Sequence, residues 1–213
     1  MKLPKGSLKW KITYILAYPI ARFILGIKVY GRENIPEEGP VILAPNHRSY
    51  IDPPVIGFAS TRETFFLAKE ELFRFKPFAL LIKFYNAIAL KRSTEAREAL
   101  IYAIDKLKSN QVVTIFPEGT RNKTKEKLLS FKLGVAFLAL NTESKVVPIY
   151  IKNNDGRAFI KPFLWIFRLK PLRVYIGKPI DPRQFENNRK GQVELAKALY
   201  LALLELIEKN SEI

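Results

Sequence analysis

The sequence contains no cysteine and only one histidine among its 213 residues. The lack of cysteine excludes disulfide bonds, zinc sites built from thiolates and an acyl-enzyme formed on a cysteine sulfur. With a single imidazole, only carboxylates remain as further metal ligands, so we expect no transition-metal centre, and we predict no cofactor. The one histidine, His47, is therefore the first candidate for proton transfer near neutral pH.

Two other common chemistries leave no motif. No Gly-x-Ser-x-Gly nucleophile elbow occurs, and the nearest approach to a P-loop, residues 26–31, continues as Arg32-Glu33 where Lys-Ser/Thr is required. The sequence has no internal repeat and no obvious second domain. With 48% hydrophobic residues, its composition is that of one globular domain with a sizeable core.

Acidic residues are scarce relative to basic ones. Lys and Arg number 36 against 20 Asp and Glu, which leaves a formal net charge of +16. This surplus predicts an anionic partner, whether nucleic acid, phospholipid headgroups or a phosphorylated substrate. The sign of the charge alone does not choose among these.

The first 32 residues contain no acidic side chain at all, although basic ones punctuate an apolar and aromatic stretch. The apolar run between Lys11 and Lys28 is shorter than the ~20 residues of a spanning helix, and Pro19 and Arg22 interrupt it. We therefore predict that residues 1–28 form a helical membrane-anchoring segment that lies in one leaflet against anionic lipid. A buried helical hairpin, a signal peptide and a true span are the alternatives.

After Gly31, short apolar runs alternate with stretches of helical periodicity. This pattern predicts an α/β fold with a mainly parallel central sheet flanked by helices. The predicted strands are residues 41–45, 64–68, 86–90, 111–116, 146–151 and 172–177. The predicted helices are residues 54–59, 70–83, 94–108, 131–141 and 190–209.

Charged or titratable groups follow four of the predicted strands in succession. They are His47, Lys69, Arg92 and the turn at residues 117–121. Ligands of open parallel sheets bind outside the carboxyl ends of the strands. The convergence of a base, cations and a glycine turn on that edge predicts a site for an anionic substrate.

His47 is followed five residues later by Asp52. A general base needs a partner that fixes its tautomer and stabilises the imidazolium, and Asp52 is the candidate. Residues five apart are ~140° apart on a regular helix, and Pro53 disfavours an α conformation before it, so we expect a compact turn or helix start that returns the carboxylate to the imidazole. The alternative is that Asp52 merely caps a helix that begins at Pro53.

The second motif is Phe-Pro-Glu-Gly-Thr-Arg at residues 116–121. Gly119 permits a positive φ and close backbone approach, Arg121 suits a phosphate, and Glu118 would hold a hydroxyl or pin the loop. The alternative is an ordinary turn before a solvated basic stretch. Lys69 is similarly either a phosphate contact or a solvated lysine at the start of a helix.

The pairing of Asn46-His47-x-x-x-x-Asp52 with this second motif resembles the glycerolipid acyltransferase family, in particular the 1-acylglycerol-3-phosphate (lysophosphatidate) acyltransferases. The resemblance extends over about residues 30–180. An intermediate family block is matched only by its arginine, Arg92, because Asn86 and Ala89 replace the usual Gly and Phe. A last block, an apolar strand with proline, is matched by residues 146–150.

The resemblance implies direct transfer of an acyl group from an acyl carrier protein or coenzyme A thioester to the sn-2 hydroxyl of 1-acylglycerol 3-phosphate, which makes phosphatidate. It implies that His47 is the catalytic base, that Asp52 orients it, and that residues 29–213 are the acyltransferase domain. The substrate-binding residues that it implies are Arg92, Glu118, Gly119, Thr120 and Arg121, with Lys69 as a further phosphate contact.

Two other functions remain open. One is an acyltransferase for glycerol 3-phosphate or another lysophospholipid, and the other is a basic membrane- or RNA-binding protein without catalysis. The aromatic residues cluster in apolar runs and no RNA-binding motif occurs, so we expect no nucleic-acid partner. The expected partners are lysophosphatidate, the acyl donor and an anionic membrane surface, with the protein on the cytoplasmic face of the cell membrane as a monotopic or peripheral enzyme.

Overall fold

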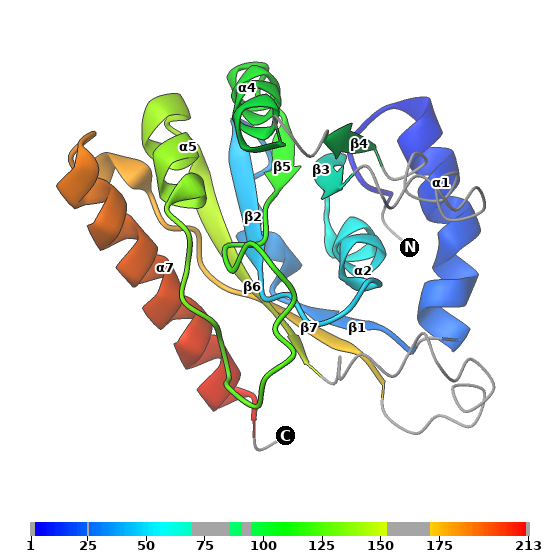
Figure 1. The fold of residues 1–213 in the computed structure, drawn as a ribbon. Coiled ribbons are helices and arrows are strands. Elements are labelled where there is room, and N and C mark those ends of the chain that lie inside the picture. The colour runs from blue at the N-terminus through cyan, green and yellow to red at the C-terminus, as the bar shows by residue number, and fades with distance from the viewer. Residues whose placement is uncertain (1–2, 25, 70–85, 91–94, 153–170, 212–213) are drawn as a thin grey trace.

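The computed structural model describes residues 3–24, 26–69, 86–90, 95–152 and 171–211. Within these residues the strands form one seven-stranded sheet in the order β1-β7-β6-β2-β5-β3-β4 (Figure 1). The strands are β1 (Lys28–Tyr30), β2 (Val41–Pro45), β3 (Thr64–Lys69), β4 (Ala87–Leu90), β5 (Val112–Thr114), β6 (Lys145–Lys152) and β7 (Arg173–Ile176).

Neighbouring strands are parallel throughout this sheet except for β6 and β7, which are antiparallel. The predicted α/β fold with a mainly parallel sheet is therefore confirmed, and each of the six predicted strands is present within two residues of its predicted ends. The sequence did not predict β1, because it has only three residues and two of them, Lys28 and Tyr30, are exposed.

The longer helices are α1 (Leu8–Pro19), α2 (Asp52–Ala59), α4 (Glu95–Lys108), α5 (Gly134–Thr142) and α7 (Arg189–Lys209). Four of the predicted helices correspond to α2, α4, α5 and α7, and the fifth, residues 70–83, lies outside the described residues. Helix α2 begins two residues earlier than predicted. The two prolines after Asp52 fit its first turn, where their missing N–H groups have no intrahelical partner.

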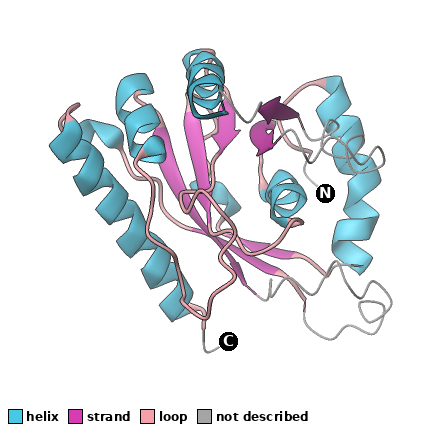
Figure 2. Ribbon diagram, in the orientation of Figure 1, coloured by secondary structure: helices cyan, strands magenta, loops and turns pink. Residues whose placement is uncertain are grey.

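Helices cover both faces of the sheet (Figure 2). On one face, α1 and α2 pack against β2, β6 and β7 through side chains such as Trp10, Val55 and Leu43. On the other face, α4, α5 and α7 pack against the alternate residues of β2, of which Ile42 is one. Because β2 is buried on both sides, all five of its residues are apolar, as is typical of a central parallel strand.

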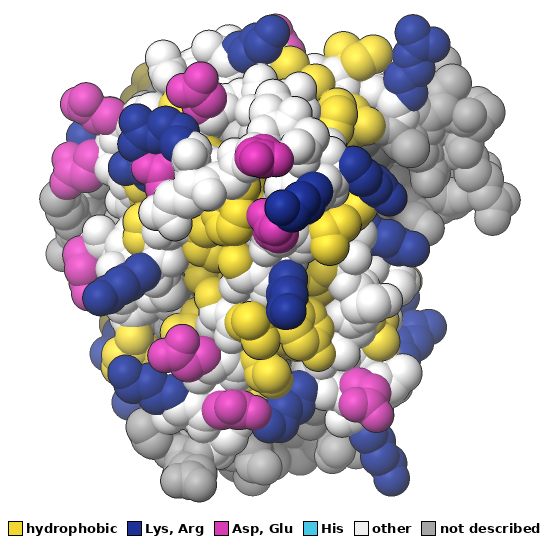
Figure 3. Space-filling model, turned by 90° about the vertical axis from the view of Figure 1, so that its left-hand side faces the viewer, with side chains coloured by type: hydrophobic (Ala, Val, Ile, Leu, Met, Phe, Trp, Pro, Cys, Tyr) yellow, Lys and Arg dark blue, Asp and Glu magenta, His cyan; other side chains and the backbone are white. Residues whose placement is uncertain are grey.

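Helix α7 forms the outermost layer on its side of the molecule. Its inner face buries a row of leucines with helical spacing, which includes Leu195, Leu199 and Leu203. The side of the molecule on which α7 lies mixes both signs of charge with apolar side chains (Figure 3). Two of the exposed apolar residues, Val193 and Leu201, lie on this helix.

Helix α1 is apolar on two sides. One side packs on the domain: Trp10 and Tyr14 are buried, and the Tyr14 ring stacks on Phe58 of α2 with 5.5 Å between centroids. The opposite side is exposed and carries a row of large apolar residues that recur once per helical turn, with Ile15 and Leu16 adjacent, and that continue into the π-helical turn at Ile20–Ile24. They are Leu8, Ile12, Ile15, Leu16, Ile20 and Phe23. No helix in the described part of the chain has the length and apolarity to cross a membrane.

The turn after β1 depends on a glycine. Gly31 has φ +78°, and a Cβ at this position would lie 2.3 Å from the carbonyl oxygen of Ile176 in β7. We predict that Gly31→Ala lowers the free energy of unfolding by about 1–3 kcal/mol from backbone strain alone, with the steric clash added. Urea denaturation followed by circular dichroism measures the change.

Gly134→Ala is the matched control. Gly134 is the first residue of α5, and an added Cβ there meets nothing within 4 Å. Its replacement should raise the free energy of unfolding by about 0.4–1 kcal/mol. Equal urea midpoints for the two variants would contradict the role given to the turn at Gly31.

Candidate active site

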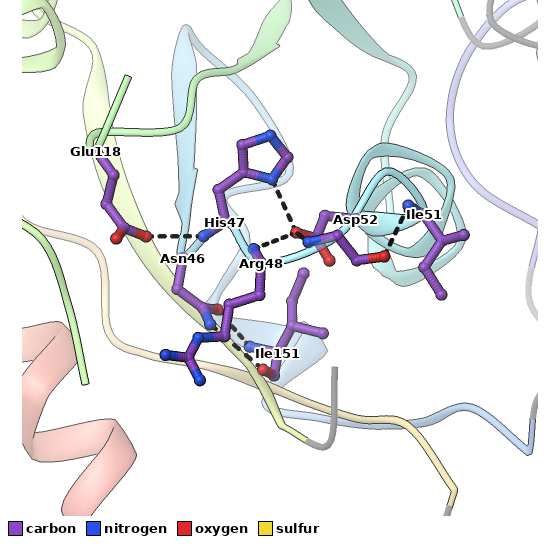
Figure 4. A network of polar contacts seen from close by, with 8 residues as sticks. Asn46, His47, Arg48, Ile51, Asp52, Glu118 and Ile151 are labelled. Carbon is purple, nitrogen blue, oxygen red and sulfur yellow. Dashed lines mark hydrogen bonds and ion pairs between the residues drawn. The ribbon is translucent and has the colours of Figure 1, made fainter. Parts of the chain in front are cut away.

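Strand β2 delivers His47 to the carboxyl end of the parallel sheet. The residue between them, Asn46, extends the pairing of β2 with β6 through its side chain. Its Oδ1 accepts from the backbone N–H of Ile151 at 2.7 Å, and its Nδ2 donates to the Ile151 carbonyl at 3.4 Å (Figure 4). The start of the loop at residues 46–52 is therefore held at a fixed place on the sheet edge.

The carboxylate of Asp52 accepts several hydrogen bonds from the preceding residues of this loop. Asp52 is fully buried, and its Oδ2 accepts from His47 Nδ1, from the Arg48 N–H and from the Ser49 N–H, each at 2.8 Å (Figure 4). Because Nδ1 faces a carboxylate, the neutral imidazole carries its proton there and offers the lone pair of Nε2. The His47 side chain is 18% exposed, so part of the imidazole is open to a ligand.

Asp52 does not act as an ordinary helix cap. The N-cap position of α2 is Ile51, without a side-chain cap bond, and the Asp52 carboxylate binds N–H groups that precede it in the chain. The sequence left open whether Asp52 merely caps a helix or turns back to the imidazole. The structure shows the second arrangement.

Glu118 joins this loop to the one at residues 116–129. It is 2% exposed, and its Oε1 accepts from the His47 N–H at 2.8 Å while its Oε2 accepts from the Leu129 N–H at 2.9 Å. Burial raises the pKa of the Glu118 carboxyl, and the two backbone hydrogen bonds together with the charges of His47 and Arg48 partly oppose that rise. Of the two roles that the sequence allowed Glu118, the geometry shows loop pinning. Its assignment to substrate binding stays a prediction.

Three residues to which the sequence assigned no role complete the frame around His47. The Asn122 N–H donates to the His47 carbonyl at 2.7 Å, and the Phe116 ring stacks on the imidazole with 3.9 Å between centroids. The Arg48 guanidinium donates to the carbonyls of Thr124 and Glu126 at 3.0 and 2.8 Å. These contacts use backbone atoms or ring faces, so no spacing rule in the sequence could have found them.

The remainder of the second motif forms the turn that was predicted. Gly119 has φ +67°, and its N–H donates to the Phe116 carbonyl at 3.0 Å. Thr120 is exposed and Arg121 half-buried. The Arg121 guanidinium contacts Tyr50 of the first loop, so the two sequence motifs meet in space.

For two of the predicted substrate-binding residues, Lys69 and Arg92, the structure does not describe the side chain. Lys69 is the last residue of β3 and pairs in register with Leu90 of β4, but its side chain lies outside the description. Arg92 lies outside the described residues. Both stay predictions for substrate binding.

A buried carboxylate, an oriented and partly exposed imidazole and a guanidinium on the adjoining loop together form a site suited to removing a proton from a hydroxyl group of an anionic substrate. The sequence model of the family described as Acyltransferase matches residues 26–152, and the chain belongs to this family.

Relatives with a more specific description match over most of the chain. The 1-acyl-sn-glycerol-3-phosphate acyltransferase of Bacillus subtilis is 25% identical and covers 88% of this chain and 92% of its own length, whereas that of Saccharomyces cerevisiae is 29% identical and covers 88% and 63%. The chain thus spans less than two thirds of the yeast relative. The crystal structure of the 1-acyl-sn-glycerophosphate (LPA) acyltransferase from Thermotoga maritima is similar with a TM-score of 0.73, at 29% identity over 94% of this chain and 78% of that one.

The role of Glu118 predicts a loss of stability on its removal. Glu118→Ala leaves the N–H groups of His47 and Leu129 without their acceptor, which should lower the free energy of unfolding by about 1–3 kcal/mol for each donor that stays buried. Glu126→Ala, which removes an exposed carboxylate of the same loop, should leave it nearly unchanged. Similar losses in both variants would contradict the pinning role.

The raised pKa of Glu118 also predicts how this difference varies with pH. The folded protein binds the Glu118 proton more tightly than the unfolded chain does. The resulting contribution to stability is fully present below the pKa of the unfolded chain and is lost as the pH rises through the higher folded pKa. The free-energy difference between wild type and Glu118→Ala should therefore decrease with rising pH across that window, as urea titrations at several pH values would measure.

Proposed function

We propose that this chain is a 1-acylglycerol-3-phosphate O-acyltransferase, which transfers an acyl group from a thioester of acyl carrier protein or coenzyme A to the sn-2 hydroxyl of lysophosphatidate. The observation that carries the proposal is the 2.8 Å contact between His47 Nδ1 and the buried Asp52 carboxylate, at the mouth of the sheet and beside the loop that bears Arg121. The relatives named above, which are 1-acyl-sn-glycerol-3-phosphate acyltransferases, support the same reaction.

The proposed reaction begins with proton removal by His47. Nε2 takes the proton of the acceptor hydroxyl while the oxygen attacks the thioester carbonyl carbon, and the Asp52 carboxylate stabilises the imidazolium that forms. Collapse of the tetrahedral intermediate breaks the carbon–sulfur bond, and the imidazolium returns the proton to the departing thiolate. The products are phosphatidate and the free thiol, and no residue of the chain becomes acylated.

The second loop is proposed to handle negative charge. Arg121 binds the acceptor phosphate, with Arg92 and Lys69 as the further cations assigned from the sequence, and Glu118 fixes the loop behind them. Gly119 and Thr120 supply loop backbone near the phosphate or the oxyanion that develops on the thioester carbonyl. The donor assigned there is the Thr120 N–H, because the Gly119 N–H donates to the Phe116 carbonyl. Preorganised donors of this kind contribute about 2.7–4 kcal/mol each to transition-state stabilisation in a comparable case.

We further propose that residues 1–28 hold the enzyme in one leaflet on the cytoplasmic face of the cell membrane, while residues 29–213 carry out catalysis. The support is the exposed apolar row of α1 and its π-helical turn, which lies on the side away from the domain, and the exposed cation Arg22 on the same segment. Lysophosphatidate and phosphatidate both reside in bilayers, so an enzyme on the leaflet exchanges them without moving an acyl chain through water.

The reaction is tested by supplying the purified protein with lysophosphatidate in vesicles and either oleoyl coenzyme A or oleoyl-acyl carrier protein, and measuring phosphatidate. Glycerol 3-phosphate as the alternative acceptor tests the related activity. His47→Ala should lower kcat by about 10²–10⁴-fold, the usual contribution of a general base, and should still bind vesicles. The proposal would be overturned if His47→Ala turned over at the wild-type rate, or if the wild type formed no phosphatidate.

Membrane docking is tested by placing charges on the exposed row of α1. Leu16→Glu and Phe23→Glu, at positions 67% and 75% exposed, should abolish co-sedimentation with vesicles containing anionic lipid. Val193→Glu and Leu201→Glu on α7, at positions 51% and 52% exposed, are the matched controls and should bind as the wild type does. Equal binding by all four variants would contradict the role assigned to α1.

A further inference from the structure

Arg121 and Tyr50 form a pair that links the two loops of the site. The Arg121 guanidinium carbon lies 3.6 Å from the centroid of the Tyr50 ring, and its Nη2 donates to the Tyr50 hydroxyl at 2.8 Å. Tyr50 lies between His47 and Asp52 in the chain, so it belongs to the loop of the catalytic base. The guanidinium proposed to bind phosphate therefore rests on a side chain of that loop.

The contact leaves the guanidinium able to bind an anion. A guanidinium has five N–H groups in a fixed fork, and Tyr50 takes one of them together with one face of the plane. The remaining edge has the geometry for a bidentate bond to phosphate oxygens. Tyr50 is 42% exposed and Arg121 half-buried, so the pair lies where a ligand can reach it.

Both ends of the pair stand on a rigid frame. The backbone just before Tyr50 is tied to the Asp52 carboxylate through the Ser49 N–H, and the backbone after Arg121 is tied by the Asn122 N–H to the His47 carbonyl at 2.7 Å. A long arginine side chain loses considerable rotamer freedom when it binds a ligand. A tyrosine that already holds the guanidinium removes part of that cost before the ligand arrives.

We propose that Tyr50 is a positioning residue that orients Arg121 for the phosphate monoester of the acceptor, and that it thereby favours a phosphorylated acceptor over a neutral one. This inference rests on the proposed acyltransferase function. Stacking and the hydrogen bond fix the guanidinium relative to the imidazole, because one short loop carries both His47 and Tyr50. The phosphate and the reacting hydroxyl of one acceptor are then bound at a set separation.

Two variants separate the contributions of the ring and the hydroxyl. Tyr50→Phe keeps the stacked ring and loses one hydrogen bond, which should raise KM for oleoyl lysophosphatidate about 2–10-fold. Tyr50→Leu loses both contacts and should raise it about 10–100-fold. In both variants kcat at saturating acceptor and its pH profile should stay close to the wild type, because the His47–Asp52 pair is intact.

The preference between two acceptors distinguishes this role from a loss of folding, because partial unfolding would lower the activity toward both acceptors equally. The preference of the wild type for oleoyl lysophosphatidate over monooleoylglycerol, measured as the ratio of kcat/KM values, should fall in Tyr50→Leu by the same factor as KM rises. In an Arg121→Met background, Tyr50→Leu should have little additional effect, since the two residues act as one unit.

An unchanged KM in Tyr50→Leu, a fall in kcat without a change in KM, or a full additional effect in the Arg121→Met background would each overturn the inference. These outcomes leave the acyltransferase reaction itself intact, because the wild type would still form phosphatidate. Failure of the wild type to form it would instead overturn the proposed function.

Discussion

The arrangement of the site depends on one oxygen atom, Oδ2 of Asp52. This atom accepts from a ring nitrogen and from two backbone N–H groups of the five residues before it, in a place with no exposure to solvent. Water cannot compete for these bonds, so they define a single conformation of the loop and a single orientation of the imidazole. The same bonds explain why α2 begins at Asp52. As the first residue of the helix, Asp52 can point its carboxylate back toward the N–H groups of the turn that precedes it.

The second loop, residues 116–129, also fixes His47 through hydrogen bonds, in this case to its backbone. Glu118 holds the His47 N–H and Asn122 binds the His47 carbonyl, so both backbone groups of the candidate base are committed to the loop that follows β5. The two strands that precede these loops are hydrogen-bonded neighbours in the sheet, which brings residues 71 positions apart into contact. The two sequence motifs are therefore one structural unit, in which the Glu118 carboxylate binds backbone N–H groups and the Arg121 guanidinium contacts the Tyr50 side chain.

Much of the fold follows from local patterns, and much of the site does not. The apolar run at residues 41–45 predicted β2 with its observed ends, because a strand buried on both faces must be apolar throughout. Strand β1 was missed because its pairing with β7 is non-local and two of its three residues are exposed. Spacing suggested the contact of His47 with Asp52, but it could not decide between a pinning and a ligand-binding Glu118, nor reveal Asn122, which acts through its backbone. Arg92 and Lys69 stay predictions.

The segment before α1 is fastened to the domain at the other end of the sheet. The Lys5 N–H donates to the Thr61 carbonyl at 2.8 Å, and the Glu63 N–H donates to the Lys5 carbonyl at 2.6 Å, while β1 fixes the chain beyond the helix. A helix secured at both ends cannot swing as a tether does. If α1 rests on a bilayer, the sheet therefore keeps a constant tilt relative to the membrane, and the imidazole stays at a constant height above the lipid phosphates. The enzyme then meets its acceptor by lateral diffusion in two dimensions, without first having to reorient.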